Sequence, residues 1–324
     1  MAKTLTNAKI ITGETTIKSG YIRFDESILE VADMANYQEN SADEVIDVNG
    51  QTIIPGFIDV HSHGGYGIDN MDADPKLIHE MTQKMLQEGI TSYFPTTMTQ
   101  SDENIENALA AIGEAAKTNP MIQGIHLEGP FVSPAYKGAQ PEQFMRAADA
   151  DTMQRWNEIS GGNLRLVTYA PEMGDVSDFE TYCTENNIVL SAGHSGATYE
   201  QLMDSKVSHV THLFNGQLGL HHREIGVAGF ALLEDDVYAE MIVDGYHITP
   251  KMVKLALKAK GADHILLITD SMRAKGQPEG ESELGGQQVF VKDKQARLEN
   301  GSLAGSVLTF IDAFKNMIEF TVCS

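Results

Sequence analysis

The sequence predicts an α/β protein, a (β/α)₈ TIM-like barrel with a small β-sandwich-like accessory domain. After Pro55-Gly56, short apolar runs alternate with polar loops and helical segments, a rhythm typical of βα units that build a parallel sheet. Eight strand candidates can be counted, the number that a closed barrel requires. They span residues 57–63, 90–97, 122–128, 164–172, 188–194, 209–215, 238–247 and 265–270.

The segment before Pro55 follows a different pattern. Residues 1–54 contain short apolar or alternating runs broken by turn residues, which indicates a small β domain. Residues 55–324 form the predicted barrel, with helices expected over segments such as 75–88 and 103–117. A β-hairpin insertion is expected near 285–302, and a helix over 305–320.

The composition limits the partners of the protein. The 324 residues carry a formal net charge of -23, so nucleic acid and anionic membranes would be repelled over the whole surface. A small anionic substrate is compatible with this charge, because nearby cations set the potential inside a pocket. Cys183 and Cys323 lack disulfide or metal-ligand spacing, and no apolar run suits a signal peptide or a membrane span. We therefore expect a cytoplasmic protein with reduced thiols.

Ionisable residues gather at one end of the predicted strands. The carboxyl ends of the strands form the catalytic face of a (β/α)₈ barrel. The residues that fall there are His61, His63, Glu128, Glu172, His194, His212, His247 and Asp270.

Two histidines and a glutamate at this face indicate a metal site. His61 and His63 are separated by one residue, so a strand places both on one face, where they can chelate a divalent transition metal. A hydrogen-bonded structural pair is the alternative for these two histidines. Glu128 ends an apolar strand, where an ionised carboxylate needs either a metal or a basic partner.

Each further residue also has a structural alternative. His194 and His212 repeat the pattern on two more strands, and each alone would suit a hydrogen-bonded core histidine. Asp270 could cap the segment that follows it. Together these alternatives require independent coincidences at the same end of different strands, which favours one metal-dependent site.

The motifs that carry these residues resemble the amidohydrolase superfamily and, within it, the N-acetylglucosamine-6-phosphate deacetylases. The order and spacing of the motifs match over almost the whole chain. The matching segments are Pro55-Gly56-Phe57-Ile58-Asp59-Val60-His61-Ser62-His63, His126-Leu127-Glu128-Gly129-Pro130-Phe131, Ala192-Gly193-His194-Ser195, Thr211-His212-Leu213-Phe214-Asn215, Asp244-Gly245-Tyr246-His247, Thr269-Asp270 and Leu303-Ala304-Gly305-Ser306.

The resemblance implies roles for these residues. Glu128, His194 and His212 would be the shared metal ligands, and His61 and His63 would hold a second ion together with Glu128 and Asp270. The ion would be Zn²⁺, with Fe²⁺, Co²⁺ or Mn²⁺ as alternatives, and one or two ions per subunit fit the sequence. Asp270 would be the general base and then the general acid.

The resemblance also implies a substrate and a partner. The substrate would be N-acetyl-D-glucosamine 6-phosphate, hydrolysed to D-glucosamine 6-phosphate and acetate. Arg223 and His247 would hold the phosphate, with Arg223 reaching the neighbouring site of a homodimer. The other contacts would come from Ala139, Gln140, Asn215, Gly216, Leu303, Ala304 and Gly305.

Two alternatives remain at this point. Another amidohydrolase, acting on a different N-acyl compound or a cyclic amide, would keep the metal site but not the anion pocket of Arg223 and His247. Members of the family continue beyond the helix that begins near Gly305, whereas this sequence ends at Val322-Cys323-Ser324. The β domain is therefore expected to lack its C-terminal strands, and a truncated, non-catalytic homologue is the second alternative.

Overall fold

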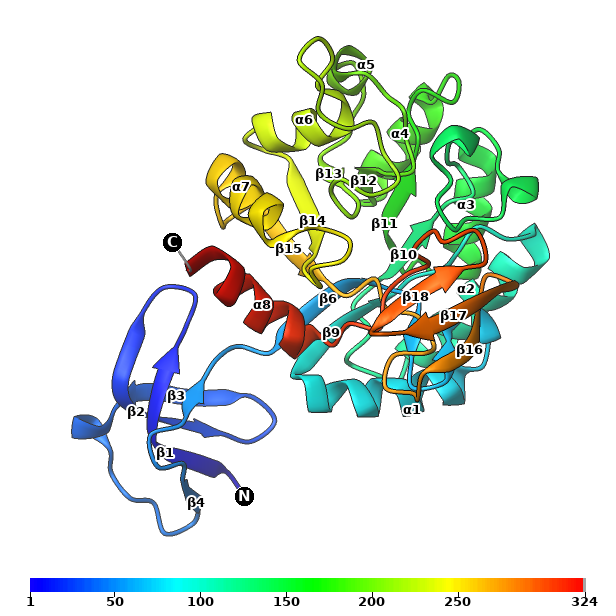
Figure 1. Ribbon diagram of the computed structural model, residues 1–324. Helices are drawn as coiled ribbons and strands as arrows, with labels where there is room; N and C mark the ends of the chain where they lie inside the picture. The colour runs from blue at the N-terminus through cyan, green and yellow to red at the C-terminus, as the bar shows by residue number, and fades with distance from the viewer. Residues whose placement is uncertain (323–324) are drawn as a thin grey trace. The chain divides into compact units, whose positions relative to one another are not determined.

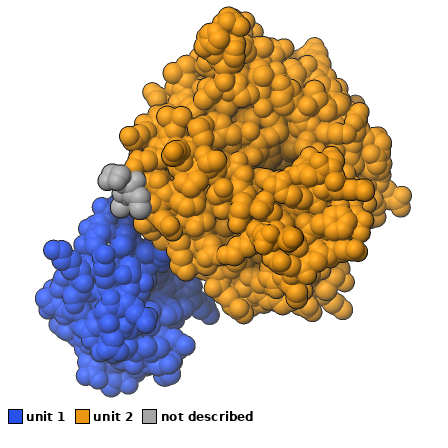
Figure 2. Space-filling view, in the orientation of Figure 1, with its two compact units in different colours: residues 1–56 blue, residues 57–324 orange. Residues whose placement is uncertain are grey.

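The computed structural model describes residues 1–322 and divides them into two compact units, 1–56 and 57 onwards (Figures 1 and 2). Residues 1–56 form one five-stranded sheet in the order β3-β2-β1-β4, with β5 paired to β1. The strands are β1 (Lys3–Ile11), β2 (Thr16–Phe24), β3 (Ile28–Asp33), β4 (Glu44–Asp47) and β5 (Thr52–Ile53). The described part of this unit is thus a single sheet, where the sequence predicted a sandwich-like module.

The second unit alternates strands with helices along its length. A six-stranded parallel sheet runs β10-β11-β12-β13-β14-β15, and β6 pairs in parallel with β9. The strands are β6 (Phe57–Ser62), β9 (Ile90–Pro95), β10 (Ile125–Glu128), β11 (Leu164–Tyr169), β12 (Val189–Ala192), β13 (His209–Val210), β14 (Tyr238–Ile242) and β15 (Ile265–Ile268). Each of the eight predicted segments therefore contains a strand.

Further contacts join the two sheets at both ends. Parallel bridges link Tyr93 of the β9 segment to Ile122 and Thr96 to His126, beside β10. At the other end, the backbone N–H of Asp270, after β15, donates to the carbonyl of His61 in β6 at 2.8 Å. The curled parallel sheet that results fits a TIM-like barrel (Figure 1).

One helix follows each of these strands. The helices are α1 (Pro75–Met85), α2 (Asp102–Ala116), α3 (Ala150–Ile159), α4 (Ser177–Glu185), α5 (Tyr199–Met203), α6 (Gly226–Leu233), α7 (Pro250–Lys260) and α8 (Phe310–Val322). Local signals set their ends. Asp74 caps α1 by accepting from the N–H of Lys76, and Gly89 closes the short extension of this helix in a left-handed conformation with φ 83°.

Apolar side chains between the strands and helices form the main core of this unit. Strand β10 is buried along its whole length, as expected for a parallel strand covered on both faces. Trp156 of α3 is fully buried and stacks on Phe131 with ring centroids 5.7 Å apart. The free thiol of Cys183 also lies in this core, and burial raises its pKa to about 12, whereas Cys323 lies outside the described residues.

Two segments differ from the sequence prediction. The expected hairpin near 285–302 is a three-stranded antiparallel sheet of β16 (Gly280–Leu284), β17 (Gln287–Lys292) and β18 (Gln295–Leu298). The first strand, Gly-Glu-Ser-Glu-Leu, is mostly polar and gave no strand signal. The last helix begins at Phe310 rather than near Gly305, because Ser306 pairs with the strand end at Asp270 instead.

None of the helices within residues 1–322 combines the length and the apolar character that a membrane span needs.

Candidate active site

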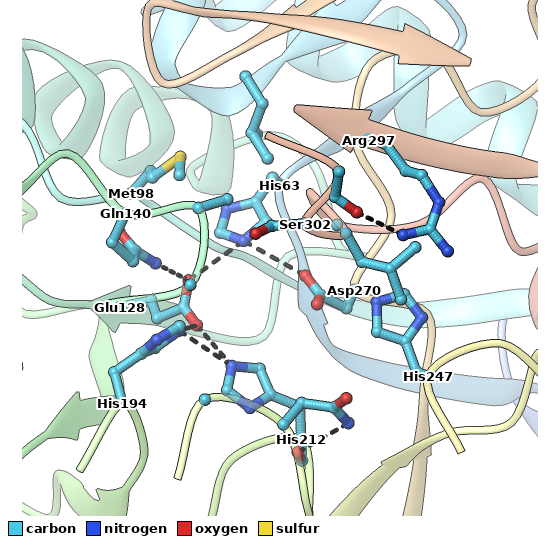
Figure 3. Close-up of a pocket in the computed structure, with 18 residues that line it drawn as sticks. His63, Met98, Glu128, Gln140, His194, His212, His247, Asp270, Arg297 and Ser302 are labelled. Carbon is cyan, nitrogen blue, oxygen red and sulfur yellow. Dashed lines mark hydrogen bonds and ion pairs between the residues drawn. The ribbon is translucent and has the colours of Figure 1, made fainter. Parts of the chain in front are cut away.

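The carboxyl ends of the parallel strands and the loops that follow them enclose a cavity of about 360 Å³ (Figure 3). Five of the predicted metal-ligand and catalytic residues line it, and each is at most 7% exposed. These residues are His63, Glu128, His194, His212 and Asp270. Strand order therefore brings together side chains that are up to 207 positions apart in the sequence, because each follows or ends a different strand.

Glu128 stands at the centre of the cluster. Its Oε1 lies 3.2 Å from His194 Nε2 and 3.1 Å from His212 Nε2, and these two nitrogens are 3.1 Å apart. His194 Nδ1 lies 2.9 Å from the carbonyl oxygen of Tyr136. A carbonyl can only accept, so Nδ1 carries the proton and the lone pair of Nε2 points at the carboxylate.

This arrangement fits a divalent cation. A lone pair that faces a carboxylate oxygen at 3.2 Å in a buried site is unfavourable unless a cation lies between them. Glu128, His194 and His212 together offer one carboxylate and two imidazole ligand atoms within 4.8 Å of one another.

A second group of ligands shares Glu128. His63 Nε2 lies 3.2 Å from Glu128 Oε2 and 3.4 Å from Asp270 Oδ1. His61 Nε2 is buried without a hydrogen-bond partner, 3.6 Å from Glu128 Oε1 and 3.5 Å from Asp270 Oδ1. His61, His63 and Glu128 form a second set of three that could hold an ion, so the site has room for one or two.

Charge interactions in this cluster are strong. Burial raises the pKa of Asp270, but His61 and His63 outweigh it and hold that pKa at about 2, so the carboxyl is ionised at neutral pH. Burial lowers the pKa of His61, yet Glu240, Asp270 and Glu128 together raise it to about 9. A metal ion bound at His61 would take the place of that proton.

The backbone at three of these positions is strained. His194, His212 and Asp270 have φ values of 48°, 32° and 46°, in the left-handed region that L residues with a side chain rarely adopt. Each of the three lies two residues beyond the end of a short strand. The left-handed turn aims each side chain into the cavity.

Comparison with known proteins places the chain in a family. Residues 52–322 match the model of the amidohydrolase family. The chain belongs to the amidohydrolase family. The N-acetylglucosamine-6-phosphate deacetylase of Bacillus subtilis is 40% identical over 97% of this chain and 82% of its own length. The resemblance inferred from the motifs is thereby confirmed, and the protein is a hydrolytic enzyme of a metal-dependent family.

Two further relatives bear on the substrate. The N-acetylgalactosamine-6-phosphate deacetylase of Escherichia coli O157:H7 is 33% identical over 86% of this chain and 75% of its own length. An Asp-to-Ala mutant of the N-acetyl-D-glucosamine-6-phosphate deacetylase of Mycobacterium smegmatis, solved in complex with N-acetyl-D-glucosamine-6-phosphate, has a TM-score of 0.91 and 27% identity. That match covers 99% of this chain and 84% of the mycobacterial one.

In this amidohydrolase, most of the predicted substrate contacts also line the cavity. They are Ala139, Gln140, Asn215, Gly216, His247, Leu303 and Gly305. Ala304 is fully buried within the same turn. Gly216, with φ 54°, lies so close to His194 that a Cβ there would be 2.8 Å from its Nδ1, so this position requires glycine.

Two of these contacts are held by carboxylates. Gln140 Nε2 donates to Glu128 Oε2 at 2.7 Å, while its Oε1 accepts from the N–H of Thr99 at 3.0 Å. His247 Nδ1 lies 2.6 Å from Asp244 Oδ2, which leaves its Nε2 for the cavity. Both side chains are thus fixed in orientation before any substrate binds.

Arg223 is the predicted residue that the structure does not bring to the cavity. It is exposed on the loop between β13 and α6, with Nη1 2.6 Å from His222 Nε2. The predicted role of Arg223 lies in the site of a neighbouring subunit, so it stays a prediction.

Several residues of the site were not predicted from the sequence. Met98, Leu284, Arg297 and Ser302 line the cavity, and Glu240 lies fully buried beneath it. Glu240 Oε2 accepts from His61 Nδ1 at 2.8 Å and from the N–H of His212 at 3.1 Å. An acidic residue inside the apolar run of β14 was the signal for Glu240, the same signal that identified Glu128.

Proposed function

We propose that this amidohydrolase removes the acetyl group of N-acetyl-D-glucosamine 6-phosphate and releases D-glucosamine 6-phosphate and acetate. The observation that carries the proposal is the Glu128-centred histidine cluster with Asp270 beside it, open to a cavity large enough for a sugar phosphate. The relatives of Bacillus subtilis and Mycobacterium smegmatis, which bear the name of this activity, support it.

Glu128, His194 and His212 would hold a divalent cation, and His61 and His63, with Glu128 and Asp270, a second one. Imidazole and carboxylate ligands suit Zn²⁺ first, and also Fe²⁺, Co²⁺ and Mn²⁺. A cation bound there would polarise the acetamide carbonyl and lower the pKa of a water molecule toward neutrality. Glu240 would support this centre by holding the proton of His61 on Nδ1, so that Nε2 faces the ion.

Asp270 would move the proton. Its carboxylate is ionised and lies 3.4 Å from His63 Nε2, at the edge of the cavity. It would accept a proton from the water whose oxygen attacks the acetamide carbon, and a tetrahedral oxyanion would form. As the C–N bond breaks, Asp270 would return that proton to the departing amine.

The sugar and the phosphate would be held by other residues that line the cavity or lie beside it. Ala139, Gln140, Asn215, Gly216 and the turn of Leu303, Ala304 and Gly305 would contact the sugar, and His247 the phosphate. Arg223 would join from the neighbouring subunit of a homodimer, which agrees with its exposure in the single chain. Its planar guanidinium suits a phosphate, because it can donate two charge-assisted hydrogen bonds at once.

The finer features of the fold are part of the proposal. The bridges at Tyr93 and Thr96 and the hydrogen bond from Asp270 to His61 support a closed (β/α)₈ barrel formed by residues 55–324. Residues 1–54 would belong to an accessory β-sandwich-like domain. The cytoplasmic location stays a prediction that cell fractionation can test.

A different N-acyl sugar is the second candidate, because the relative of Escherichia coli O157:H7 is named for the galactosamine epimer. The experiment combines metal analysis with an acetate-release assay on N-acetylglucosamine 6-phosphate, N-acetylgalactosamine 6-phosphate and unphosphorylated N-acetylglucosamine. We expect bound metal and fastest turnover of the first compound. Faster turnover of the second would assign the protein to the epimer, and a metal-loaded protein that releases no acetate would refute the proposal.

A further inference from the structure

Arg297 gives the cavity a cationic group that no other lining residue supplies. Among the described residues that line the cavity, it is the only arginine or lysine. The protein has a formal net charge of -23, so an arginine at the mouth of this cavity is a local exception to the surrounding potential. A dianionic group bound in this part of the cavity would be attracted by this guanidinium.

The guanidinium is oriented by neutral acceptors. Nε and Nη2 donate to Gln295 Oε1 at 3.2 and 2.6 Å, and Nη1 donates to the carbonyl of Gly301 at 2.5 Å. Within residues 1–322, no carboxylate forms an ion pair with it, in contrast to Arg273, which pairs with Asp72 and Glu283. The positive charge of Arg297 is therefore held in place without being neutralised.

The backbone around Arg297 is hydrogen-bonded to the turn of Leu303, Ala304 and Gly305. Arg297 forms an antiparallel bridge with Leu303, and the N–H of Ala304 donates to the carbonyl of Ala296 at 3.0 Å. The same turn reaches the proton-transfer residue, because the N–H of Ser306 donates to the carbonyl of Asp270 at 2.7 Å. Backbone hydrogen bonds thus connect strand β18, through this turn, to Asp270.

The position of Arg297 suits the far end of the substrate. Figure 3 shows Arg297 and His247 on one side of the cavity, with Glu128 and His194 on the opposite side and Asp270 between them. A substrate with its acetamide at Asp270 and Glu128 would direct its distal group toward Arg297 and His247. In the proposed substrate that distal group is the 6-phosphate.

We propose that Arg297 is a specificity-determining residue that binds the 6-phosphate from the same chain. This inference rests on the proposed function. It differs from the expected role of Arg223, because Arg297 lines the cavity of a single subunit and needs no partner. A guanidinium has five N–H groups, and the three hydrogen bonds to Gln295 and Gly301 leave two of them for a phosphate.

The test compares Arg297→Gln, Arg297→Lys and the wild-type protein, each loaded with Zn²⁺. Arg165→Gln is the matched control, since Arg165 also donates only to carbonyls, of Gly162 and Leu164, and lies at the opposite end of β11 from the cavity. Calorimetry measures the binding of glucosamine 6-phosphate and of glucosamine, and acetate release gives kcat/KM for phosphorylated and unphosphorylated N-acetylglucosamine.

We expect Arg297→Gln to weaken binding of the 6-phosphate compounds by roughly tenfold to a hundredfold, the usual loss for a charge-assisted hydrogen bond, and to leave the unphosphorylated ones unchanged. Arg297→Lys should restore part of the loss, and Arg165→Gln should change neither. Equal losses for both kinds of sugar, or no loss, would overturn the proposal. Wild-type protein that binds glucosamine 6-phosphate without releasing acetate would refute the proposed function, while the same calorimetric comparison would still decide the role of Arg297.

Discussion

The two sides of the cavity are built in different ways. Glu128, His194 and His212 stand at strand ends, are at most 6% exposed, and hold each other at 3.1–3.2 Å. Arg297 and Arg223 are exposed, and neither forms a carboxylate ion pair among the described residues. The parallel sheet fixes the proposed reacting side, whereas loops and an inserted sheet form the side that would recognise the substrate. Changes on the first side should therefore affect chemistry, and changes on the second should affect selectivity.

The largest effect is expected for His194→Ala. It removes one ligand of the set Glu128, His194 and His212, so turnover and the ion held by this set should both be lost, as should the rise in Tm that this ion confers on the folded state. Metal analysis, acetate release and thermal unfolding with and without Zn²⁺ measure this. His79→Ala, an exposed histidine of α1, is the control. Normal metal and rate in the His194 variant would contradict the ligand assignment.

Asp270→Asn should reduce kcat by about 10²–10⁴-fold, because asparagine keeps the size of the side chain but cannot accept a proton from water. Substrate affinity should change much less, since its contacts lie on other residues. Metal must be quantified on the same preparation, where the ion of Glu128, His194 and His212 should remain. A metal-loaded variant with near-normal kcat would eliminate Asp270 as the base and leave the fold unaffected.

Glu240→Gln tests the support beneath the reacting side. The neutral amide should hold the Nδ1 proton of His61 more weakly, so affinity for an ion at His61 and His63 should fall roughly 10- to 100-fold. Competition with a chelator measures this affinity. Glu180→Gln is the control, because Glu180 is another buried carboxylate but does not line the cavity. It accepts a hydrogen bond of 2.5 Å from Tyr169 Oη, and its replacement should leave the metal affinity unchanged. Equal metal affinities in the Glu240→Gln and Glu180→Gln variants would show that Glu240 contributes to folding but not to metal binding.

The smallest effect is expected for Arg223→Ala, on the recognition side. We expect KM for the 6-phosphate to rise about tenfold and the preference over plain N-acetylglucosamine to narrow, with partial rescue by lysine, which lacks the bidentate fork. The preference should also fall at protein concentrations at which the dimer dissociates. An unchanged preference would place phosphate recognition on this chain's own residues.

The sequence was sufficient for the elements that follow simple periodic rules. All eight strand segments contain a strand, and the residues predicted at their ends, such as Glu128 and Asp270, meet in one cavity. This succeeded because the carboxyl ends of parallel strands necessarily point the same way. The cluster of histidine and carboxylate side chains that could bind a metal was predictable for the same reason.

The inserted sheet of β16, β17 and β18, and the two arginines of the recognition side, were not predictable to the same degree. β16 is too polar to be recognised as a strand, and its pairing with β17 depends on contacts that have no sequence period. Arg297 alternates outward on β18 like any surface arginine, so only the folded position of that sheet identifies it as a cavity residue. Arg223 illustrates the converse, because the resemblance to the family pointed to it while the single chain leaves it exposed.

The left-handed backbone at His194, His212 and Asp270 has a consequence for laboratory evolution. Each such residue costs about 1–3 kcal/mol, and glycine adopts the same conformation without that cost. A selection for heat resistance carried out with a chelator should therefore enrich glycine at these three positions and yield hardier but inactive proteins. The same selection with Zn²⁺ present should retain His194 and His212. The bound ion should stabilise the folded state by more than a glycine would gain by relieving the backbone strain. The presence or absence of Zn²⁺ during the selection would therefore decide whether the stabilised variants keep their activity.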